Sequence, residues 1–236
     1  AKPVIVPAKN KYHHDLPAMK KAINDKTRIV FICNPNNPTG TMLTQAETDE
    51  FMQSIPDSVL VVFDEAYYEF VTRPDYTQSL NYLKTGKNVM VLRTFSKIYG
   101  LAGLRVGYGF ADAQLITDFN RVRTPFNVNR IAMFAAEAAL DDQDYVVKCA
   151  NLNTEGKNYI YSEMAKLGLP YVETEGNFIL IDTLKNGMDI YQKMLQLGVI
   201  VRPMGMYKLP TCIRVTIGTM EENKRFVESL AQVIKS

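Results

Sequence analysis

Three polar motifs in this sequence each follow a β-rich apolar run, and this order constrains the fold more than any other feature. The motifs begin at Asn34, Asp64 and Thr94, where the runs end. Helical patterns lie between the runs, so strands and helices alternate along the chain. Such alternation is typical of α/β proteins with a mainly parallel sheet, which bind ligands outside the carboxyl ends of their strands. We therefore expect the three motifs to meet at one edge of a sheet.

Hydrophobic periodicity predicts the individual elements. The first strands are expected at residues 27–33, 59–64, 88–93 and 105–110, and the first helices at 16–23, 45–55, 79–84 and 113–121. Residues 131–167 are expected to form one helix, or two with a break near Asp141-Asp142. Beyond them we predict strands at 171–173, 178–182, 199–202 and 212–216, and helices at 188–197 and 220–234. The chain then divides into a large domain, 1–130, and an interdomain helix with a small α+β domain, 131–236.

Lys97 lies among hydroxyl residues and is followed by an arginine, in a pattern that favours a cofactor site. A lysine amine can hold an aldehyde cofactor as a Schiff base, while Thr94, Ser96 and Arg105 supply the hydroxyls and the guanidinium fork that suit a phosphate. A lone Ser-Lys pair is more often a solvated surface feature. The glycines after Lys97 could also be loop punctuation, although the segment has neither the Walker nor the Rossmann spacing.

Two upstream motifs complete the requirements of pyridoxal phosphate. Asp64 ends an apolar run, and a buried carboxylate is needed to keep the pyridine nitrogen protonated. Asn37, in Asn-Pro-Asn-Asn-Pro-Thr-Gly, and Tyr67 are neutral donors for the phenolate oxygen. Taken singly, the Asn-Pro motif is a rigid turn and Asp64 is a turn or cap residue. Their occurrence together with Lys97 favours the cofactor interpretation.

The motifs at 34–40, 63–67, 93–105 and 213–219 resemble those of the class II branch of the fold type I pyridoxal-phosphate aminotransferases, most closely the histidinol-phosphate aminotransferases. The resemblance covers essentially the whole chain. It suggests a sharp turn with a cis Asn37-Pro38 bond, since only X-Pro bonds adopt cis at modest cost. The cofactor-binding residues that it implies are Asn37, Asp64, Tyr67, Thr94, Ser96, Lys97 and Arg105, of which Lys97, Asp64 and Tyr67 are the catalytic candidates.

Substrate-binding candidates lie in the predicted small domain. Arg214 alternates with apolar residues and shares a strand face with Thr216. The resemblance implies that Arg214, together with Arg202, grips the anionic end of the substrate, which a planar guanidinium suits. Asn177 is a further candidate for a polar substrate contact, with a turn role as the alternative.

The resemblance implies a transaminase that moves an amino group between histidinol phosphate and 2-oxoglutarate in histidine biosynthesis. An aromatic or broad-specificity aminotransferase, a phosphothreonine-type decarboxylase and a non-catalytic fragment are the alternatives. Members of the family carry a further stretch before the position of Ala1, with a covering arm, a phosphate cup and a stacking aromatic residue. The N-terminal part of the family fold is therefore expected to be absent here, and the complete protein is expected to be a homodimer.

Composition agrees with a cytoplasmic enzyme of small-molecule amino and 2-oxo acids. The formal charge of +2 argues against nucleic acid or an acidic membrane surface as a partner. Cys33, Cys149 and Cys212 lack metal-ligand spacing and are interpreted as buried thiols of a reducing compartment. His13-His14 is interpreted as an exposed loop pair, so no metal site is expected. No apolar run approaches the ~18 residues that a membrane span needs.

Overall fold

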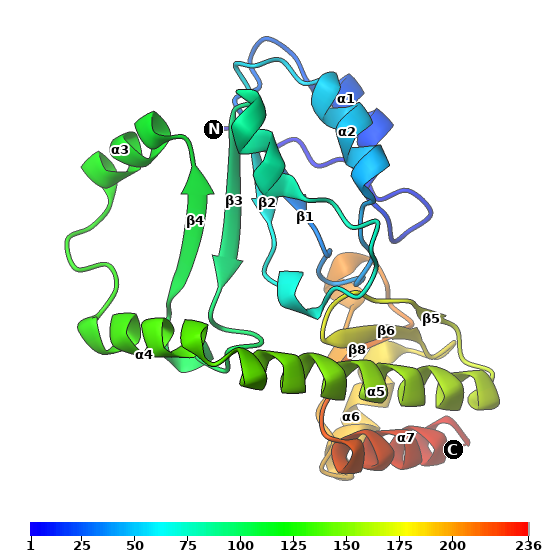
Figure 1. Cartoon of the computed structure of the whole chain (residues 1–236). Helices are drawn as coiled ribbons and strands as arrows, with labels where there is room; N and C mark the ends of the chain where they lie inside the picture. The colour runs from blue at the N-terminus through cyan, green and yellow to red at the C-terminus, as the bar shows by residue number, and fades with distance from the viewer. Residues whose placement is uncertain (236) are drawn as a thin grey trace. The chain divides into compact units, whose positions relative to one another are not determined.

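The computed structural model describes residues 1–235, which form two compact units (Figure 1). The first unit comprises Ala1–Asn37 and Thr41–Val146. The second comprises Pro38–Gly40 and the residues from Val147 onward. The Asn-Pro motif is therefore divided between the units, Asn37 belonging to the first and Gly40 to the second.

The boundary between the units falls later than the division after residue 130 that the sequence suggested. It lies between Val146 and Val147, within a helix. The physical reason is packing, because Ala132 and Ala136 lie in one buried apolar cluster with Phe95. The helix that follows residue 130 thus belongs to the core of the first unit.

A four-stranded sheet with the order β1-β2-β3-β4 forms the centre of the first unit (Figure 1). Its strands are β1 (Ile29–Cys33), β2 (Leu60–Asp64), β3 (Val89–Thr94) and β4 (Gly107–Ala111). The first three strands are parallel, and β4 is antiparallel to β3. The predicted mainly parallel sheet is confirmed, and the carboxyl ends of β1, β2 and β3 lie at one edge.

One face of this sheet is covered by α1 (Leu16–Ala22), α2 (Gln45–Gln53) and η2 (Ser79–Thr85). Their apolar side chains pack in one cluster with Phe63 and Val91 of the sheet. Burial of such a side chain contributes roughly 1.5–3 kcal/mol. The helix predicted at residues 79–84 is a 3-10 helix, whereas α1 and α2 are α-helices as expected.

The opposite face of the sheet is covered less completely. Leu115 of α3 (Ala113–Val122) packs against Val62 and its neighbours. On β1, by contrast, Ile29 is 48% exposed and Phe31 is 67% exposed. The terminal strand β1 therefore presents apolar side chains to solvent.

The long helical segment is broken near Asp141-Asp142, as one of the two predicted forms required. Helix α4 (Arg130–Asp141) is followed by α5 (Gln143–Leu167). Asp142 between them is non-helical, and its Oδ1 accepts a hydrogen bond from the Tyr145 backbone N–H at 3.1 Å. Because an aspartate side chain satisfies an otherwise unpaired N–H at a helix start, Asp142 caps α5 and separates the two helices.

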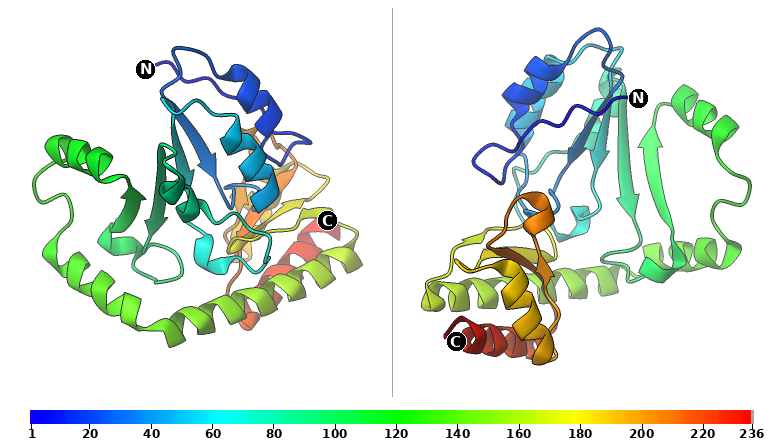
Figure 2. Two further views of the ribbon diagram at one scale, coloured as in Figure 1. Left: turned by 45° about the horizontal axis from the view of Figure 1, so that its top comes forward. Right: turned by 180° about the vertical axis from the view of Figure 1, so that it is seen from behind.

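The second unit is an antiparallel sheet packed against helices, which confirms the predicted α+β arrangement. Its sheet has the order β5-β6-β8-β7. The strands are β5 (Tyr171–Val172), β6 (Phe178–Asp182), β7 (Arg202–Pro203) and β8 (Cys212–Thr216), and the helices are the later part of α5, α6 (Gly187–Gln196) and α7 (Met220–Lys235). Helices α6 and α7 lie side by side (Figure 2), and α5, α6, α7, β6 and β8 share one apolar core.

The strand predicted at residues 199–202 is shorter and begins later, at Arg202. Gly198 has φ +74°, and the N–H of Val199 donates to the carbonyl oxygen of Met194 in α6 at 3.0 Å. A glycine in the left-handed region commonly ends a helix in this way. Residue 199 therefore still belongs to the turn after α6, which delays the start of β7.

Gly40 shows why the short segment Pro38–Gly40 belongs to the second unit. Its carbonyl oxygen accepts a hydrogen bond from the Glu175 N–H at 2.9 Å. Its φ is +81°, and a Cβ there would lie 2.1 Å from the Thr174 Oγ1. Only glycine allows this backbone conformation together with so close an approach.

The cis peptide bond of the Asn-Pro motif is Asn34–Pro35, so the prediction of a cis Asn37-Pro38 bond is wrong. Both bonds join asparagine to proline, and the cost of the cis form is similar for the two pairs. Asn34 is also buried, and its Oδ1 accepts a hydrogen bond from the Leu43 N–H at 2.8 Å. The sequence alone does not reveal this contact.

Candidate active site

Asp64 is the last residue of β2, at the carboxyl edge of the first sheet. Its carbonyl oxygen accepts a hydrogen bond from the Asn34 N–H at 2.9 Å, and its Oδ1 accepts one from the Ala66 N–H at 3.1 Å. The side chain is exposed, whereas the sequence analysis required a buried carboxylate. Asp64 lines a hollow, so a ligand in the hollow would cover it.

This hollow has a volume of about 330 Å³ and lies in the first unit. It is lined by Asp64, Ala66, Leu92, Arg93, Thr94, Ser96, Lys97 and Arg105. The structure thus brings together a carboxylate, an amine, hydroxyls and guanidinium groups that are separated in the sequence. Such a donor set could hold a ligand with carbonyl, cationic and phosphate groups.

The loop after β3 positions the basic residues of the hollow. The Ser96 N–H donates to the Thr94 Oγ1 at 3.0 Å, which folds the chain back just before Lys97. Arg105 has φ +56°, and its guanidinium donates to the Ala102 carbonyl oxygen at 2.7 Å. Such a conformation is uncommon in a residue with a side chain and often marks a functional segment.

Asn37 and Tyr67 lie close to each other and to Lys97. The Asn37 Nδ2 is 3.5 Å from the Tyr67 hydroxyl oxygen, at the limit of a hydrogen bond. The Lys97 Nζ is 5.2 Å from the centre of the Tyr67 ring, and Tyr67 is buried. These predicted residues therefore form one neighbourhood at the carboxyl edge of the sheet.

An ion pair beside the hollow was missed by the sequence analysis. Both the Nε and the Nη2 of Arg93 lie 2.9 Å from the Glu65 Oε2. The Ser79 hydroxyl donates to the Glu65 Oε1. Burial raises the pKa of Glu65, while the Ser79 hydrogen bond and the charge of Arg93 oppose this shift. The available signal was a charged residue, Arg93, at the end of an apolar run.

A second carboxylate, Glu69 in η1 (Tyr68–Phe70), approaches the same guanidinium. Its Oε2 is buried and has no hydrogen-bond partner within residues 1–235. Burial raises the pKa of Glu69 to about 7, while a hydrogen bond to its own backbone and the nearby charge of Arg93 oppose this shift. Glu69 therefore titrates near neutral pH.

His14 differs from its predicted role, whereas His13 is exposed as expected. The His14 Nε2 lies 2.8 Å from the Cys33 carbonyl oxygen, which accepts its hydrogen bond. Burial lowers the pKa of His14, and burial together with the charge of Asp64 raises the pKa of the Cys33 thiol to about 11. His14 thus supports the end of β1, and the prediction that it is exposed is wrong. No sequence spacing distinguishes these two histidines.

The predicted substrate residues lie in the second unit. Arg202 and Arg214 are directly paired across β7 and β8, so both side chains leave the sheet on one face. The Arg214 guanidinium carbon lies 4.7 Å from the Phe178 ring centre. The Asn177 carbonyl oxygen accepts a hydrogen bond from the Ile217 N–H at 2.9 Å. The strand pairing thus brings the two arginines together, and the backbone hydrogen bond to Ile217 fixes Asn177 next to the same sheet.

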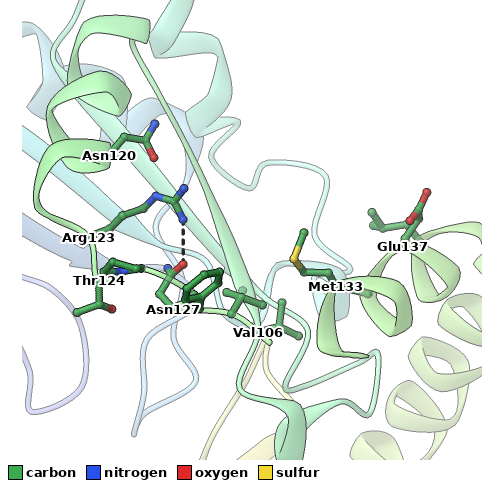
Figure 3. Close-up of a pocket in the computed structure, with 13 residues that line it drawn as sticks. Val106, Asn120, Arg123, Thr124, Asn127, Met133 and Glu137 are labelled. Atoms are coloured by element: carbon green, nitrogen blue, oxygen red, sulfur yellow. Dashed lines mark hydrogen bonds between the residues drawn. The ribbon is translucent and has the colours of Figure 1, made fainter. Parts of the chain in front are cut away.

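A larger hollow of about 940 Å³ lies elsewhere in the first unit (Figure 3). Figure 3 shows Asn120 of α3 on one side and Met133 and Glu137 of α4 on another. Its lining is largely apolar, and the Arg123 guanidinium already donates to the Asn127 Oδ1 at 3.0 Å. No lysine is among its lining residues, so the smaller hollow, which contains Lys97, is the better candidate site.

The cysteines, possible metal ligands and possible membrane spans can be compared with what the sequence suggested. The three cysteines are free thiols, but only Cys212 is buried; Cys33 and Cys149 are partly exposed, which corrects their interpretation as buried. Among residues 1–235, no group of three or more His, Cys, Asp or Glu side chains is arranged to hold a metal ion. In the same part of the chain, no helix combines the length and the apolar character needed to cross a membrane.

The fold places a carboxylate, an amine, hydroxyls and guanidinium groups at the carboxyl edge of an α/β sheet, where proteins of this class bind ligands. Residues 1–230 match the family of class I and II aminotransferases, and the chain belongs to this family. A histidinol-phosphate aminotransferase from Moorella thermoacetica is 52% identical over 230 residues. Histidinol-phosphate aminotransferase 1 from Nitrosococcus oceani is 48% identical over 235 residues.

Solved structures agree with this assignment. The histidinol-phosphate aminotransferase from Sinorhizobium meliloti, in complex with pyridoxal-5'-phosphate, superimposes with a TM-score of 0.90 at 31% identity. The match covers 98% of this chain and 64% of that structure. The match to the Moorella relative covers 97% of this chain and 59% of that protein. The match to the Nitrosococcus relative covers 100% of this chain and 63% of that protein. The chain thus spans about three fifths of the length of the relatives that it matches.

Proposed function

We propose that the complete protein is a pyridoxal-phosphate-dependent transaminase that exchanges an amino group between histidinol phosphate and 2-oxoglutarate. The observation that carries this proposal is the hollow where Asp64, Lys97 and Arg105 meet. Membership of the class I and II aminotransferases supports the reaction type. The names of the similar proteins support the choice of substrate.

The residues around the hollow fit pyridoxal phosphate by their chemistry. The Lys97 amine suits the aldehyde, and the Asp64 carboxylate suits a protonated pyridine nitrogen. Thr94, Ser96 and Arg105 offer hydroxyls and a guanidinium fork for the phosphate. The cofactor, when bound, supplies an electron sink for the carbanion at the substrate carbon.

The protein side chains then have distinct roles. Lys97 Nζ accepts the proton from the substrate carbon and later returns a proton as a general acid. Asp64 keeps a positive charge stable at the ring nitrogen, and Asn37 with Tyr67 donates hydrogen bonds to the phenolate oxygen. The contact between Asn37 and Tyr67 and the closeness of Lys97 to the Tyr67 ring support these assignments.

Arg202 and Arg214 are proposed to bind the anionic end of the substrate. Like charges directly opposite each other on neighbouring strands repel, and an anion between them offsets this repulsion. A guanidinium also binds phosphate or carboxylate through two parallel hydrogen bonds. Asn177, which directly precedes β6, is proposed to add a polar contact.

We also propose that the complete protein is a homodimer in the cytoplasm. Apolar side chains of the first unit support an interface, since Phe126 is 95% exposed and Ile131 is 75% exposed. The free thiols support a reducing compartment. Sedimentation of the full-length protein at two concentrations tests the dimer, because a monomer at both concentrations contradicts it.

An assay of full-length protein with pyridoxal phosphate tests the reaction. Histidinol phosphate, phenylalanine and phosphothreonine are supplied in parallel, and amino transfer to 2-oxoglutarate is followed together with carbon dioxide release. We expect fast transfer from histidinol phosphate with ping-pong kinetics. Preferred transfer from phenylalanine would indicate an aromatic transaminase, and carbon dioxide from phosphothreonine would indicate a decarboxylase. No product from any of the three substrates contradicts catalysis.

A further inference from the structure

The ion pair between Glu65 and Arg93 is unusually well enclosed. The exposed fraction of the side chain is 1% for Glu65 and 12% for Arg93. Two guanidinium nitrogens reach the same carboxylate oxygen, and Ser79 donates to the other oxygen. The guanidinium carbon also lies 3.5 Å from the Tyr68 ring centre. The ion pair with Glu65 and the Tyr68 ring therefore hold the Arg93 guanidinium in one position.

The pair joins the two strand ends that carry the candidate catalytic residues. Glu65 directly follows Asp64 at the end of β2, and its N–H donates to the Leu92 carbonyl oxygen of β3 at 2.9 Å. Arg93 lies in β3, just before the loop that contains Lys97. A bond between Glu65 and Arg93 therefore limits the movement of Asp64 relative to the start of that loop.

Stability alone does not account for a buried ion pair at this place. Well-packed apolar residues of similar volume often replace such a pair without loss of stability, because they avoid the desolvation of two charges. What apolar residues lack is a fixed direction, whereas a planar guanidinium holds a carboxylate at a defined distance and angle. The pair is suited to fix geometry.

We propose that Glu65 and Arg93 are positioning residues, which hold Asp64 and Lys97 in the relative geometry that amino transfer requires. This inference rests on the proposed transaminase function. Arg93 also lines the hollow, but the positioning role requires neither residue to contact the substrate. Their effect passes through the strand ends, since a small misplacement of reacting groups costs about 10²-fold in rate.

Variants of the full-length protein test this inference. Arg93→Lys keeps the charge and removes the fork, Glu65→Gln removes the carboxylate charge, and Ser79→Ala removes one hydrogen bond to Glu65. Arg121→Lys is the matched control, because Arg121 pairs with Asp118 in the same unit with side chains 70% and 51% exposed. For each variant we would measure pyridoxal phosphate affinity, the pH midpoint of the visible absorbance of the bound cofactor, kcat, KM and the melting temperature.

We expect Arg93→Lys and Glu65→Gln to lower kcat by about 10–100-fold while KM changes by less than about threefold. The pH midpoint of the absorbance should shift in the same variants, and Ser79→Ala should show a smaller change in the same direction. The control Arg121→Lys should leave all these quantities unchanged. If Glu65→Gln does not fold, Arg93→Lys and Ser79→Ala decide the question.

A lower melting temperature with an unchanged pH midpoint and with kcat within about twofold of the wild type would overturn the inference, because the role would then be structural only. In that case a wild-type protein that binds the cofactor and transfers amino groups leaves the proposed function intact. A wild-type protein that binds no pyridoxal phosphate overturns both proposals.

Discussion

The two units of the chain contribute different chemistry to the proposed reaction. The first unit gathers the Lys97 amine, the Asp64 carboxylate, hydroxyls and the Arg105 guanidinium around one hollow. The second unit offers a pair of arginines on neighbouring strands, Arg202 and Arg214. A mixed donor set fits a cofactor with several functional groups, whereas paired cations fit a single anion. Mutations should therefore separate cofactor retention from substrate affinity.

The largest expected effect follows from removing the amine of the first unit. Lys97→Ala should lower kcat by at least about 10³-fold, because the general base is lost. Borohydride reduction of the wild-type protein with pyridoxal phosphate, followed by peptide mapping, should place the label on Lys97. Lys148→Ala, at an exposed position of α5, is the control. Label on another lysine would contradict the assigned role.

The next effect concerns the carboxylate of the first unit. Asp64→Asn should retain part of the cofactor but lower kcat by about 10²–10³-fold, because a neutral amide does not hold the pyridinium charge and each pKa unit is worth about 1.4 kcal/mol. Turnover and cofactor retention after dialysis provide the measurement. The control is Asp57→Asn, at an exposed aspartate that pairs with Lys87. Near-normal turnover in Asp64→Asn would contradict the proposed role of Asp64 as the partner of the ring nitrogen.

A reciprocal pair of variants tests the division between the units directly. Arg214→Lys should raise the KM for histidinol phosphate by about 10–100-fold, because a charged hydrogen bond worth roughly 1.5–3 kcal/mol is weakened. Its cofactor retention should stay unchanged. Arg105→Lys should weaken cofactor retention and affect KM less. If both variants change the same quantity, the proposed separation of roles is wrong.

The smallest expected effect is a change in the stability of the first unit, which contains Glu69. Glu69 has its pKa raised from 4.5 to about 7 by burial, so the folded protein binds this proton more tightly than the unfolded chain. The stability of the wild type therefore falls as pH rises from about 4.5 to about 7. Glutamine does not ionise, so the stability of Glu69→Gln does not fall over this pH range. Above pH 7 its free energy of unfolding should therefore exceed that of the wild type by about 1–3 kcal/mol.

Denaturant unfolding of Glu69→Gln at pH 5 and at pH 8 provides the measurement. The stabilisation relative to the wild type should be larger at pH 8. Glu50→Gln, at an exposed position of α2, is the control and should show the same difference at both pH values. An equal difference for Glu69→Gln at the two pH values would show that Glu69 is not the titrating group.

The sequence predicts the strand ends well because periodicity and residue type are local signals. The runs before Asp64 and Thr94 are apolar and rich in β-formers, and the polar residues follow at once. Parallel pairing then brings these positions to one edge without further information. Lys97 and Arg105 fall at the same edge because the loop that carries them leaves β3 there.

Other features depend on contacts between distant residues, which one sequence does not reveal. The Glu65–Arg93 pair requires the register of β2 against β3, and the partial burial of His14 goes with its contact with Cys33. The choice of Asn34–Pro35 as the cis bond goes with tertiary contacts of Asn34. The late start of β7 depends on the turn at Gly198.

The exposed side chains of β1 affect how the chain behaves in concentrated solution. Within residues 1–235 this strand ends the sheet order, contains no charged residue, and presents Ile29 and Phe31 to solvent. Natural proteins protect edge strands with charges, prolines or covering segments, because an open edge is a template for a strand from another molecule. Two copies that pair through β1 use the same strand on both molecules, so each copy covers the open edge of the other. Light scattering of this chain should therefore rise with concentration, through backbone pairing at β1 and independently of any catalytic dimer.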